Sequence, residues 1–388
     1  MFKQIGAVVG MNVRSLPQRL GASAVTVIGI AAVVAVMVSI LAISAGLMQS
    51  AGRASLPNSA IVLSAGATAA YMGSISREQA AIIADAPGLK IGPDGKPMVD
   101  SQATIIVEVT KKSDGSTANT AMQGVSLRWL KMHPKQYQVL EGRLFRPGLR
   151  ELIVGKNVGQ SFRNLGVGDT IKLRGSDWKV VGSFTANGGL AENAIIADPD
   201  TVLAAFERNA YQSVSAELQS PGAFRRFKDS LTANPQLKVD VKPMDEYVRD
   251  QLSQLTTILN FVGYFMGAVM AVGAVFGALN TMYAAVDGRA REIATLRAIG
   301  FGGFPVVVSV MVESLLIAVP GALLGALVAW LLFNGNAAHI SALTFPVVVT
   351  PGLMVLGLIW ALIIGLVGGL APSIRAARLP VATALRAS

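Results

Sequence analysis

The chain has 388 residues, of which 52% are hydrophobic and only 14% are charged, a balance that argues against an ordinary soluble protein. Its formal net charge is +10, but the excess is not gathered in one patch, so the charge does not indicate nucleic-acid binding. No cysteine is present, which excludes disulfides, zinc sites with cysteine ligands and thiol nucleophiles. The two histidines, His133 and His339, stand far apart without carboxylate neighbours, which argues against a metal site or a catalytic triad and favours ordinary surface residues.

Residues 1–20 are predicted to form a cytoplasmic N-terminal segment, because Lys3, Arg14 and Arg19 are its only charged residues. Residues 21–50 then contain no charge and are long enough to cross a bilayer core of about 30 Å as a first transmembrane helix. A cleaved signal peptide is the alternative, since small residues follow. The apolar region of such a peptide spans only about 7–15 residues, which favours a retained membrane anchor.

Residues 51–250 are predicted to form a large α+β domain outside the membrane, because acidic and basic residues are mixed here as in a solvated domain. The sequence Ser76–Gln79 is a capping box, which starts a helix. Alternation of short strands and helices indicates two subdomains, one inserted in the other. Strands are expected at 60–63, 103–109, 119–125, 170–173, 178–184 and 237–241, and further helices at 201–208 and 223–231.

A helical spacing of apolar residues begins at Asp245 and continues into the next apolar run. Residues 251–286 carry no charge and are predicted to hold the end of a stalk helix and the second transmembrane helix. Such continuity would matter mechanically, since a helix transmits displacement along its axis and a flexible loop does not.

A short charged segment, residues 287–303, separates this run from the next and is predicted to turn the chain around at a membrane surface. The third and fourth transmembrane helices are expected at 304–333 and 352–371. A short, uncharged external loop, 334–351, is predicted to join them.

Basic residues mark three of the connecting pieces. Three lie in the N-terminal segment, three in residues 287–303 and three at the C-terminal end, which includes the tail 372–388, whereas residues 334–351 have none. The positive-inside rule therefore predicts that both termini and the charged segment are cytoplasmic and that the large domain is outside.

Glycines in the apolar runs recur at intervals of four residues. Removing side chains at that interval lets helix backbones approach closely, and packing drives helix association in lipid. We expect these glycines to pack the four helices of one chain and to serve contacts with another subunit. They are Gly263, Gly267, Gly273, Gly277, Gly321 and Gly325.

Glu313 is the single charged residue within the third apolar run. An ionised carboxylate at the bilayer centre costs about 2.5–3.5 kcal/mol on insertion scales, so its side chain should face protein or water. One interpretation is a proton or ion relay. No other span offers an ionisable partner, which favours a structural or inter-subunit hydrogen bond.

The charged segment contains more than a membrane anchor needs. A basic anchor requires neither Glu292 nor exposed apolar side chains, and we expect Ile293 and Leu296 to be exposed. Apolar residues flanked by charges are what a protein partner would bind. The chain has no P-loop, since Gly95-Lys96 and Gly155-Lys156 lack the required glycine spacing, so any ATP would be hydrolysed by another polypeptide.

Three sequence motifs in a fixed order now resemble the permease subunits of the MacB/FtsX superfamily, which includes LolC/E-like members and is also called the type VII ABC transporters. The segment REIATLRAIGFG resembles the conserved segment that follows the second span in that family. The run VMVESLLIAVPGALLGALVAWLL resembles its third span, and APSIRAARLPVATALRA its C-terminal end. LEGRLFRPG, in the large domain, resembles the MacB-type periplasmic core.

This resemblance implies a membrane protein with four transmembrane α-helices and a large α+β periplasmic domain of the MacB type, in the bacterial inner membrane. It implies a non-catalytic subunit with no cofactor of its own, paired with a second permease copy or homologue and an ABC ATPase that binds ATP and magnesium. The charged segment would be the coupling helix seated in that ATPase. The ATPase-coupling residues would be Arg289, Arg291, Glu292, Ile293, Leu296, Arg297 and Gly300.

The function that we expect is mechanotransmission, in which ATP hydrolysis on the partner moves the stalk and the periplasmic domain. Export of a periplasmic substrate, with an adaptor and an outer-membrane channel, is the leading interpretation, because the external domain is large enough to present a docking platform. One alternative is a lipoprotein-releasing permease. Another, of a different class, is an FtsX-like scaffold that activates a cell-wall hydrolase.

Overall fold

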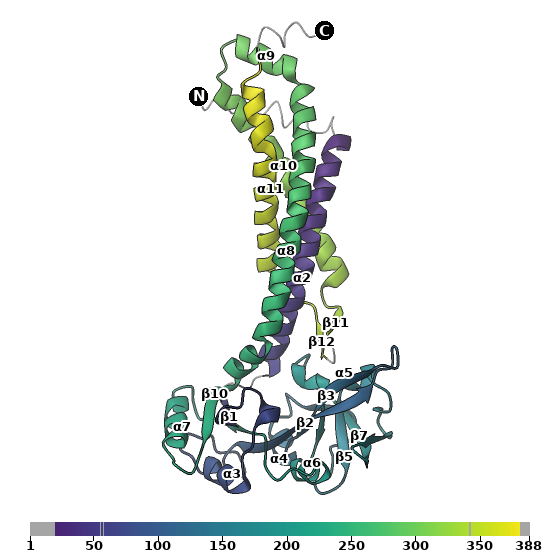
Figure 1. Cartoon of the computed structure of the whole chain (residues 1–388), viewed down its shortest axis with the longest axis vertical. Coiled ribbons are helices and arrows are strands. Elements are labelled where there is room, and N and C mark those ends of the chain that lie inside the picture. The colour runs from purple at the N-terminus through teal and green to yellow at the C-terminus, as the bar shows by residue number, and fades with distance from the viewer. Residues whose placement is uncertain (1–19, 55, 57, 341–342, 381–388) are drawn as a thin grey trace. The chain divides into compact units, whose positions relative to one another are not determined.

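The fold was analysed in a computed structural model that describes residues 20–54, 56, 58–340 and 343–380 (Figure 1). Most of the expected cytoplasmic N-terminal segment and the end of the expected tail, residues 381–388, lie outside the described residues. The described chain has two compact units. A helical unit holds residues up to Ala45, Thr257–Asn336 and those from Val347 onward, and a large domain holds Gly46–Thr256 and Ala337–Pro346.

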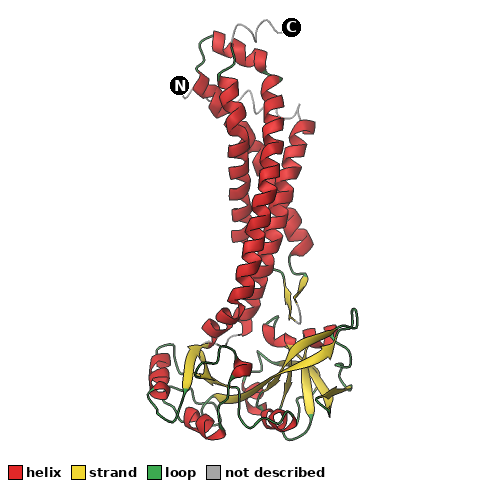
Figure 2. Ribbon diagram, in the orientation of Figure 1, coloured by secondary structure: helices red, strands yellow, loops and turns green. Residues whose placement is uncertain are grey.

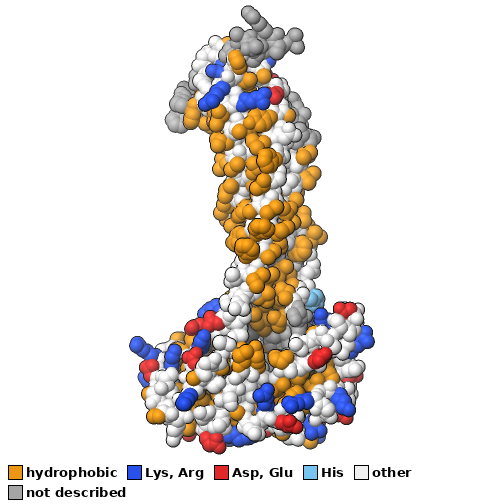
Figure 3. Space-filling model, viewed as in Figure 1, with side chains coloured by type: hydrophobic (Ala, Val, Ile, Leu, Met, Phe, Trp, Pro, Cys, Tyr) orange, Lys and Arg blue, Asp and Glu red, His pale blue; other side chains and the backbone are white. Residues whose placement is uncertain are grey.

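The helical unit is built from helices that are long and apolar enough to cross a membrane, four of them among the described residues. They are α2 (Leu20–Ala54), α8 (Met244–Asp287), α10 (Gly303–Phe333) and α11 (Pro351–Ala377), with the shorter α9 (Ala290–Ala298) between α8 and α10. Helix α8 is uninterrupted over 44 residues, and its first turns belong to the large domain. Hydrophobic side chains cover the visible face of this unit, as a lipid environment requires (Figure 3).

Four of the six glycines singled out for packing lie where another helix comes close. A Cβ atom on Gly325 would lie 2.5 Å from the carbonyl oxygen of Ala31, and one on Gly321 would lie 2.9 Å from the Cβ of Ile30, both on α2. Gly263 and Gly267 of α8 likewise face Leu41 and Met37 of α2. Gly273 and Gly277, in contrast, face open space, so neither packs a helix within the described chain.

The large domain is built on a mixed sheet with strand order β10-β1-β9-β2-β3-β8-β5-β7-β4, and β6 pairs with β7 at its side (Figure 2). Most neighbours are antiparallel, but β3–β8 and β5–β7 are parallel. The strands are β1 (Ser59–Ser64), β2 (Val99–Thr110), β3 (Thr117–Gly124), β4 (Gln138–Gly142), β5 (Glu151–Gly155), β6 (Thr170–Leu173), β7 (Ser176–Thr185), β8 (Ala194–Ala197), β9 (Ser213–Glu217) and β10 (Val239–Pro243).

Short helices pack around this sheet. Helix α3 (Arg77–Ala84) starts with the predicted capping box, in which Ser76 and Gln79 satisfy each other's backbone N–H groups. Asp198 caps α6 (Pro199–Ala205), and Phe227 and Leu231 bury one face of α7 (Ala223–Thr232). The remaining helical pieces are η2 (Ala70–Met72), α4 (Leu127–Met132), α5 (Lys156–Ser161) and η3 (Leu190–Asn193).

Two hydrophobic clusters stabilise the large domain. The larger one includes Val62, Ile105, Trp178 and Phe227, so it draws on strands from both ends of the sheet. The smaller one gathers around Phe145 and Phe184. Because the 12-residue strand β2 pairs with β9 through Val99–Gln102 and with β3 through Ala103–Thr110, the sheet is continuous across the domain.

The connection between α10 and α11 is not a plain loop. It contains a hairpin of β11 (Ala337–Ile340) and β12 (Leu343–Pro346), which belongs to the large domain. The side chain of Asn193 makes two hydrogen bonds with the backbone of Thr344. It accepts from the N–H at 2.8 Å and donates to the carbonyl oxygen at 3.0 Å. Asn157 donates to the same carbonyl at 2.9 Å, and Phe345 is fully buried. This hairpin is therefore fastened to η3 and α5.

His133 was expected to be a surface residue, and this expectation was wrong. It is the C-cap residue of α4, and its side chain is buried. Its ring lies 4.4 Å from that of Trp129, its Nδ1 is 2.8 Å from the Trp129 carbonyl oxygen, and its Nε2 is 3.4 Å from Glu217. His339 is exposed, as predicted.

Candidate functional site

The charged segment, residues 287–303, forms a helical turnaround between α8 and α10. Helix α8 ends at Asp287, α9 covers Ala290–Ala298, and Gly300 has φ +101°, a conformation that glycine adopts without strain. Gly302 then precedes α10 as its cap residue. The chain thus reverses direction between α8 and α10, and α9 is held at the shared end of α8, α10 and α11 (Figure 1).

A buried ion pair supports this turnaround from inside the helical unit. Arg289, at the start of α9, donates to Glu313 of α10, and both side chains are less than a tenth exposed. Glu313 lies ten residues into α10, or about 15 Å along its axis at 1.5 Å per residue. Its second carboxylate oxygen has no hydrogen-bond partner among the described residues. The carboxylate is therefore compensated within one chain, by Arg289, which the sequence had predicted to be an ATPase-coupling residue.

Apolar contacts fix the inner face of α9. Ile293 is buried against Val286, Val306 and Val310, together with Ala376 of α11. The expectation that Ile293 is exposed was wrong, because the turnaround folds this side of α9 onto the ends of α8 and α10.

Two further contacts tie the end of α11 to the same site. Arg297 of α9 donates to the carbonyl oxygen of Leu379 at 2.7 Å. Arg375 of α11 lies 3.4 Å from Asp287 and 5.3 Å from the centre of the Tyr283 ring. These contacts join α8, α9 and α11, so a displacement of α9 would have to move the ends of the other helices as well.

The outer face of α9 carries the side chains that remain accessible. Arg291, Glu292 and Thr295 are exposed, and Leu296 is half-buried. Ile299 was missed by sequence reasoning, yet 72% of it is exposed. Because 292, 295, 296 and 299 are spaced as i, i+3, i+4 and i+7, they share one helix face. We call these four residues the α9 outer face.

The described part of the chain offers no cluster of metal ligands. Within those residues, no group of three or more histidine, aspartate or glutamate side chains is placed to hold a metal ion. Two ion pairs use charged groups at the turnaround, Arg289 with Glu313 and Arg375 with Asp287.

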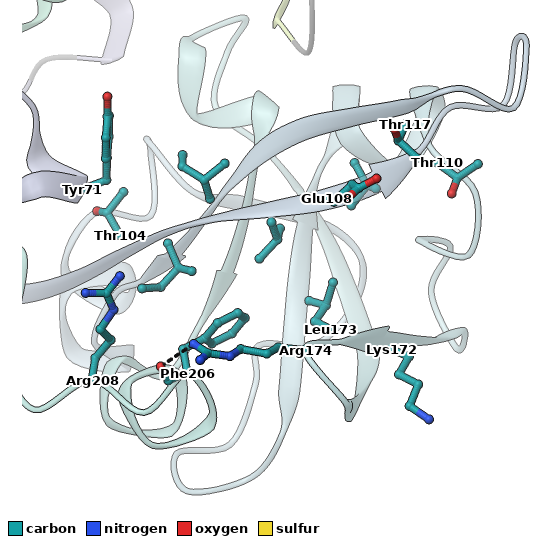
Figure 4. A pocket seen from close by; sticks show the side chains of 14 residues that line it. Tyr71, Thr104, Glu108, Thr110, Thr117, Lys172, Leu173, Arg174, Phe206 and Arg208 are labelled. Atoms are coloured by element: carbon teal, nitrogen blue, oxygen red, sulfur yellow. Dashed lines mark hydrogen bonds between the residues drawn. The ribbon is translucent and has the colours of Figure 1, made fainter.

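A surface hollow of about 710 Å³ lies on the large domain, along β2 and beside the β6–β7 turn (Figure 4). Its rim carries Glu108, Lys172, Arg174 and Arg208, all exposed to solvent. Arg174 donates to the carbonyl oxygen of Phe206 at 2.8 Å, which anchors the turn to the end of α6. The hollow is open and its charges are solvated, so it offers no enclosed site for a ligand.

Two family descriptions cover nearly all of the chain. Residues 23–243 match the "MacB-like periplasmic core domain", and residues 264–381 match the "FtsX-like permease C-terminal" description. The turnaround described above falls in the second region and the mixed sheet in the first. The chain belongs to the MacB/FtsX family of ABC permeases.

Known relatives include longer proteins. The permease is 24% identical over 397 residues to the "Macrolide export ATP-binding/permease protein MacB" of Bdellovibrio bacteriovorus, a match that covers 94% of this chain and 59% of that protein. It is 27% identical over 143 residues to the "Uncharacterized ABC transporter permease YknZ" of Bacillus subtilis, covering 36% of this chain and 35% of that protein. It therefore spans only part of the length of each of these relatives.

Solved structures of extracytoplasmic domains are also similar. The extracellular domain of YknZ from Gram-positive bacteria matches 48% of this chain and 100% of that chain, at 16% identity and a TM-score of 0.36. The periplasmic region of MacB from Actinobacillus actinomycetemcomitans matches 50% and 92%, at 11% identity and a TM-score of 0.36.

Membership of this family confirms the predicted fold class, with four apolar helices and a large domain of mixed sheet and helices. It makes the protein an ABC permease.

Proposed function

We propose that the permease is the non-catalytic subunit of an ABC transporter and that α9 is its coupling helix. ATP, with magnesium, would be bound and hydrolysed on a separate ATPase subunit seated against the α9 outer face. The observation that carries this proposal is the contrast between the two faces of α9. One face is locked to three membrane helices by Ile293 and Arg297, and the other presents Leu296 and Ile299 beside charged side chains.

Rigidity of the site is what a force-transmitting element needs. The buried Arg289–Glu313 pair fixes the start of α9 against α10, and an ion pair in this position cannot be exchanged for water contacts without a large penalty. A push on the outer face would therefore move the helix ends together instead of deforming the turnaround.

Helix α8 would carry the movement onward. It has no break between Met244 and Asp287, and its first turns belong to the large domain. Tyr247 accepts from the backbone N–H of Ala70 at 2.8 Å, and Gln251 donates to the Thr68 carbonyl at 2.5 Å. These two bonds fasten the start of α8 to η2, so a displacement of α8 would be passed directly to the domain.

The large domain would act on a substrate outside the membrane. We propose export of a periplasmic substrate with the help of an adaptor protein and an outer-membrane channel, because the 24% identical relative is named a macrolide export protein and the match covers 94% of this chain. In this arrangement the chain lies in the bacterial inner membrane, with α9 and both termini in the cytoplasm and a second permease copy beside it. The count of basic residues in the connecting pieces supports this orientation.

Co-purification with an ABC ATPase subunit encoded beside the permease tests the coupling role. Leu296→Asp and Ile299→Asp each place a charge on the α9 outer face, and each is expected to lower ATPase association at least about tenfold, since buried apolar anchors dominate interface energies. The stimulation of ATPase activity by the permease, measured in the same nanodiscs, should fall in parallel.

The matched control is Leu149→Asp, the same exchange at an exposed leucine of the large domain. It should leave both association and stimulation unchanged. Unaltered ATPase association in the Leu296→Asp and Ile299→Asp variants would remove α9 as the coupling helix, whatever substrate the transporter handles.

A further inference from the structure

A second cavity of the large domain, of about 320 Å³, lies under the start of α8. Its floor is one face of the sheet, and its walls come from η2, η3, α4 and the first two turns of α8. It is separate in character from the open hollow of Figure 4, although Tyr71, Thr104 and Ile106 border both. All of the residues that line it belong to the large domain.

The floor of this cavity contains two buried hydroxyl groups without a partner. Ser213 and Ser215 of β9 are at most 2% exposed, and neither Oγ atom has a hydrogen-bond partner among the described residues. Because side chains alternate along a strand, both hydroxyls are on the face opposite Val214, which is in the main hydrophobic cluster. A buried polar group left without a partner destabilises a protein, and such groups normally bind water or a ligand.

Neighbouring strands place more uncharged polar groups on the same face. Ser59 of β1, Gln102 and Thr104 of β2 and Gln123 of β3 border the cavity with the two serines. The opposite face of these strands is apolar, with Val62, Ile105 and Met122 in the core. A run of amides and hydroxyls on a buried sheet face has no packing advantage, which points to recognition of hydrogen-bonding groups.

The lining has no lysine, arginine, aspartate, glutamate or histidine, and its larger side chains are aromatic, namely Tyr71, Trp129, Tyr137 and Tyr247. The nearest carboxyl group is that of Asp100, the cross-strand neighbour of Ser215, which is outside the lining and already accepts from Gln102 and from the Ser126 backbone N–H. An anion entering the cavity would lose its hydration without gaining a counter-charge, and a cation would meet only a carboxyl group that is already engaged. A ligand with an apolar body would instead gain contacts with the aromatic rings, and its hydroxyl, carbonyl or amide groups could reach the serines. At about 320 Å³ the cavity is at the small end of known ligand pockets.

We propose that this cavity is a binding site for a small, uncharged organic molecule with an aromatic or aliphatic body and hydroxyl or amide groups, bound through Ser213 and Ser215. The site stands whether or not the permease is an exporter. Tyr247 and Gln251 of α8 border it too, so a bound ligand would touch the helix that connects the two units.

Three probes that share one skeleton and differ in charge test the proposal on the full-length permease in lipid nanodiscs. They are N-acetyltyrosinamide, which is uncharged, N-acetyltyrosine, an anion, and tyrosinamide, a cation. Binding is measured by saturation-transfer NMR. The uncharged probe is expected to bind at least about tenfold more tightly than either ion, because the lining itself offers no counter-charge and Asp100 is engaged by its own hydrogen-bond donors.

Variants then locate the binding. In the double variant Ser213→Ala/Ser215→Ala, affinity for N-acetyltyrosinamide should fall about tenfold, since two hydrogen bonds to the ligand are lost. Ser230→Ala is the matched control: the same exchange in the large domain, outside the cavity, at a hydroxyl that already donates to the Phe227 carbonyl at 2.8 Å. The affinity of this variant should stay within about twofold of the wild type, because the Ser230 hydroxyl does not border the cavity.

Neither serine in the double variant has a protein hydrogen bond to lose, so folding should persist, and thermal unfolding checks this. Equal binding of the three probes, binding of none of them, or full affinity in the double variant would each overturn the proposal. In the second case the two hydroxyls hold water alone.

Discussion

Buried polar groups are treated in opposite ways in the two units of the permease. The helical unit buries full charges, Arg289 and Glu313, and pairs them with each other. The large domain buries neutral hydroxyls and amides, and its buried carboxyl groups accept hydrogen bonds from neutral donors: Asp100 from Ser126 and Gln102, Glu192 from Thr185 and two backbone N–H groups, and Asp198 from Thr201. The difference follows from the surroundings, because an unpaired charge near hydrocarbon has no access to water, whereas a domain in water can reserve uncharged polar surface for ligands.

The largest effect is expected from breaking the charged pair. Arg289→Ala leaves Glu313 buried and uncompensated, which should lower the free energy of unfolding by about 3–5 kcal/mol. The double variant Arg289→Met/Glu313→Leu should recover most of this loss, since hydrophobic replacement of a whole buried pair is often nearly neutral. Unfolding by SDS in bicelles measures both.

The control for this prediction is the exposed pair at the same site. Arg375→Ala removes the 3.4 Å contact with Asp287, where both side chains are more than half exposed, and should cost less than about 1 kcal/mol. A loss of similar size in Arg289→Ala and Arg375→Ala would mean that the charged pair is not desolvated, and the contrast between the two units would fail.

The next largest effect on stability is expected at glycines that pack against another helix. Glycine-to-alanine variants distinguish these packed helix faces from open ones. Gly325→Ala pushes a Cβ atom to 2.5 Å from the Ala31 backbone oxygen, which cannot move aside without shifting α2, and should cost about 1–3 kcal/mol. Gly277→Ala meets no atom within 4 Å and should be neutral or stabilise the monomer by up to about 1 kcal/mol through helix propensity. The same SDS titration reports both values.

If Gly277→Ala destabilises the protein only above a threshold concentration of permease, that face serves a contact between two copies, as we expected from the sequence. If it destabilises the isolated monomer, the helical unit packs in another way than described here.

Much of the helical unit could be predicted because its signals are local. A run of apolar residues, a charge count and a glycine interval all lie within one segment, and α10, predicted over 304–333, covers Gly303–Phe333. The same holds in the large domain for the capping box at Ser76 and for the strand pairs β2–β3 and β6–β7, which short turns connect.

Elements defined by distant partners were missed. Strand β8 has only four residues, all buried, and it forms by pairing with β3 more than 70 residues earlier. Hairpin β11–β12 likewise depends on Asn193, about 150 residues before it. Within the candidate site, the inward turn of Arg289 depends on Glu313 across a helix reversal. One signal was available: Glu313 is the only acid of its span, and three arginines lie in the charged segment before that span.

Asn193, whose side-chain amide binds the β11–β12 hairpin, tests how much uncharged buried hydrogen bonds stabilise the large domain. Asn193→Ala removes two bonds to Thr344 and leaves its backbone groups without these partners, which should destabilise the hairpin by about 1–3 kcal/mol. Hydrogen exchange of residues 337–346 should accelerate accordingly, by about tenfold or more. His339→Ala, which removes only an exposed 3.0 Å contact with the Thr344 hydroxyl, is the control and should leave the exchange nearly unchanged.

The smallest effect is expected from Asp100, one of the buried carboxyl groups of the large domain. Burial raises its pKa to about 6, although hydrogen bonds from Ser126 and Gln102 and the charge of Arg128 oppose the shift. Its usual pKa is near 3.9, so between pH 4 and pH 6 the folded state binds more protons at this site than the unfolded state. The contribution of Asp100 to stability therefore grows as pH falls through about 6 and is complete near pH 4.

Asp100→Asn should remove this pH dependence. Relative to the wild type, the variant should be more stable at pH 7 by about 1–2 kcal/mol, and the difference should shrink as the pH is lowered to 4.5. Comparing the two proteins at each pH cancels the contributions that other groups make to stability. One such group is Glu151, whose pKa is lowered by its bonds with Arg143, so its contribution to stability is lost as the pH falls. A difference that stays constant from pH 4.5 to pH 7 would show that Asp100 is not desolvated. Water would then reach the carboxyl group of Asp100 in the large domain, and Asp100 and Glu313 would differ only in their access to water.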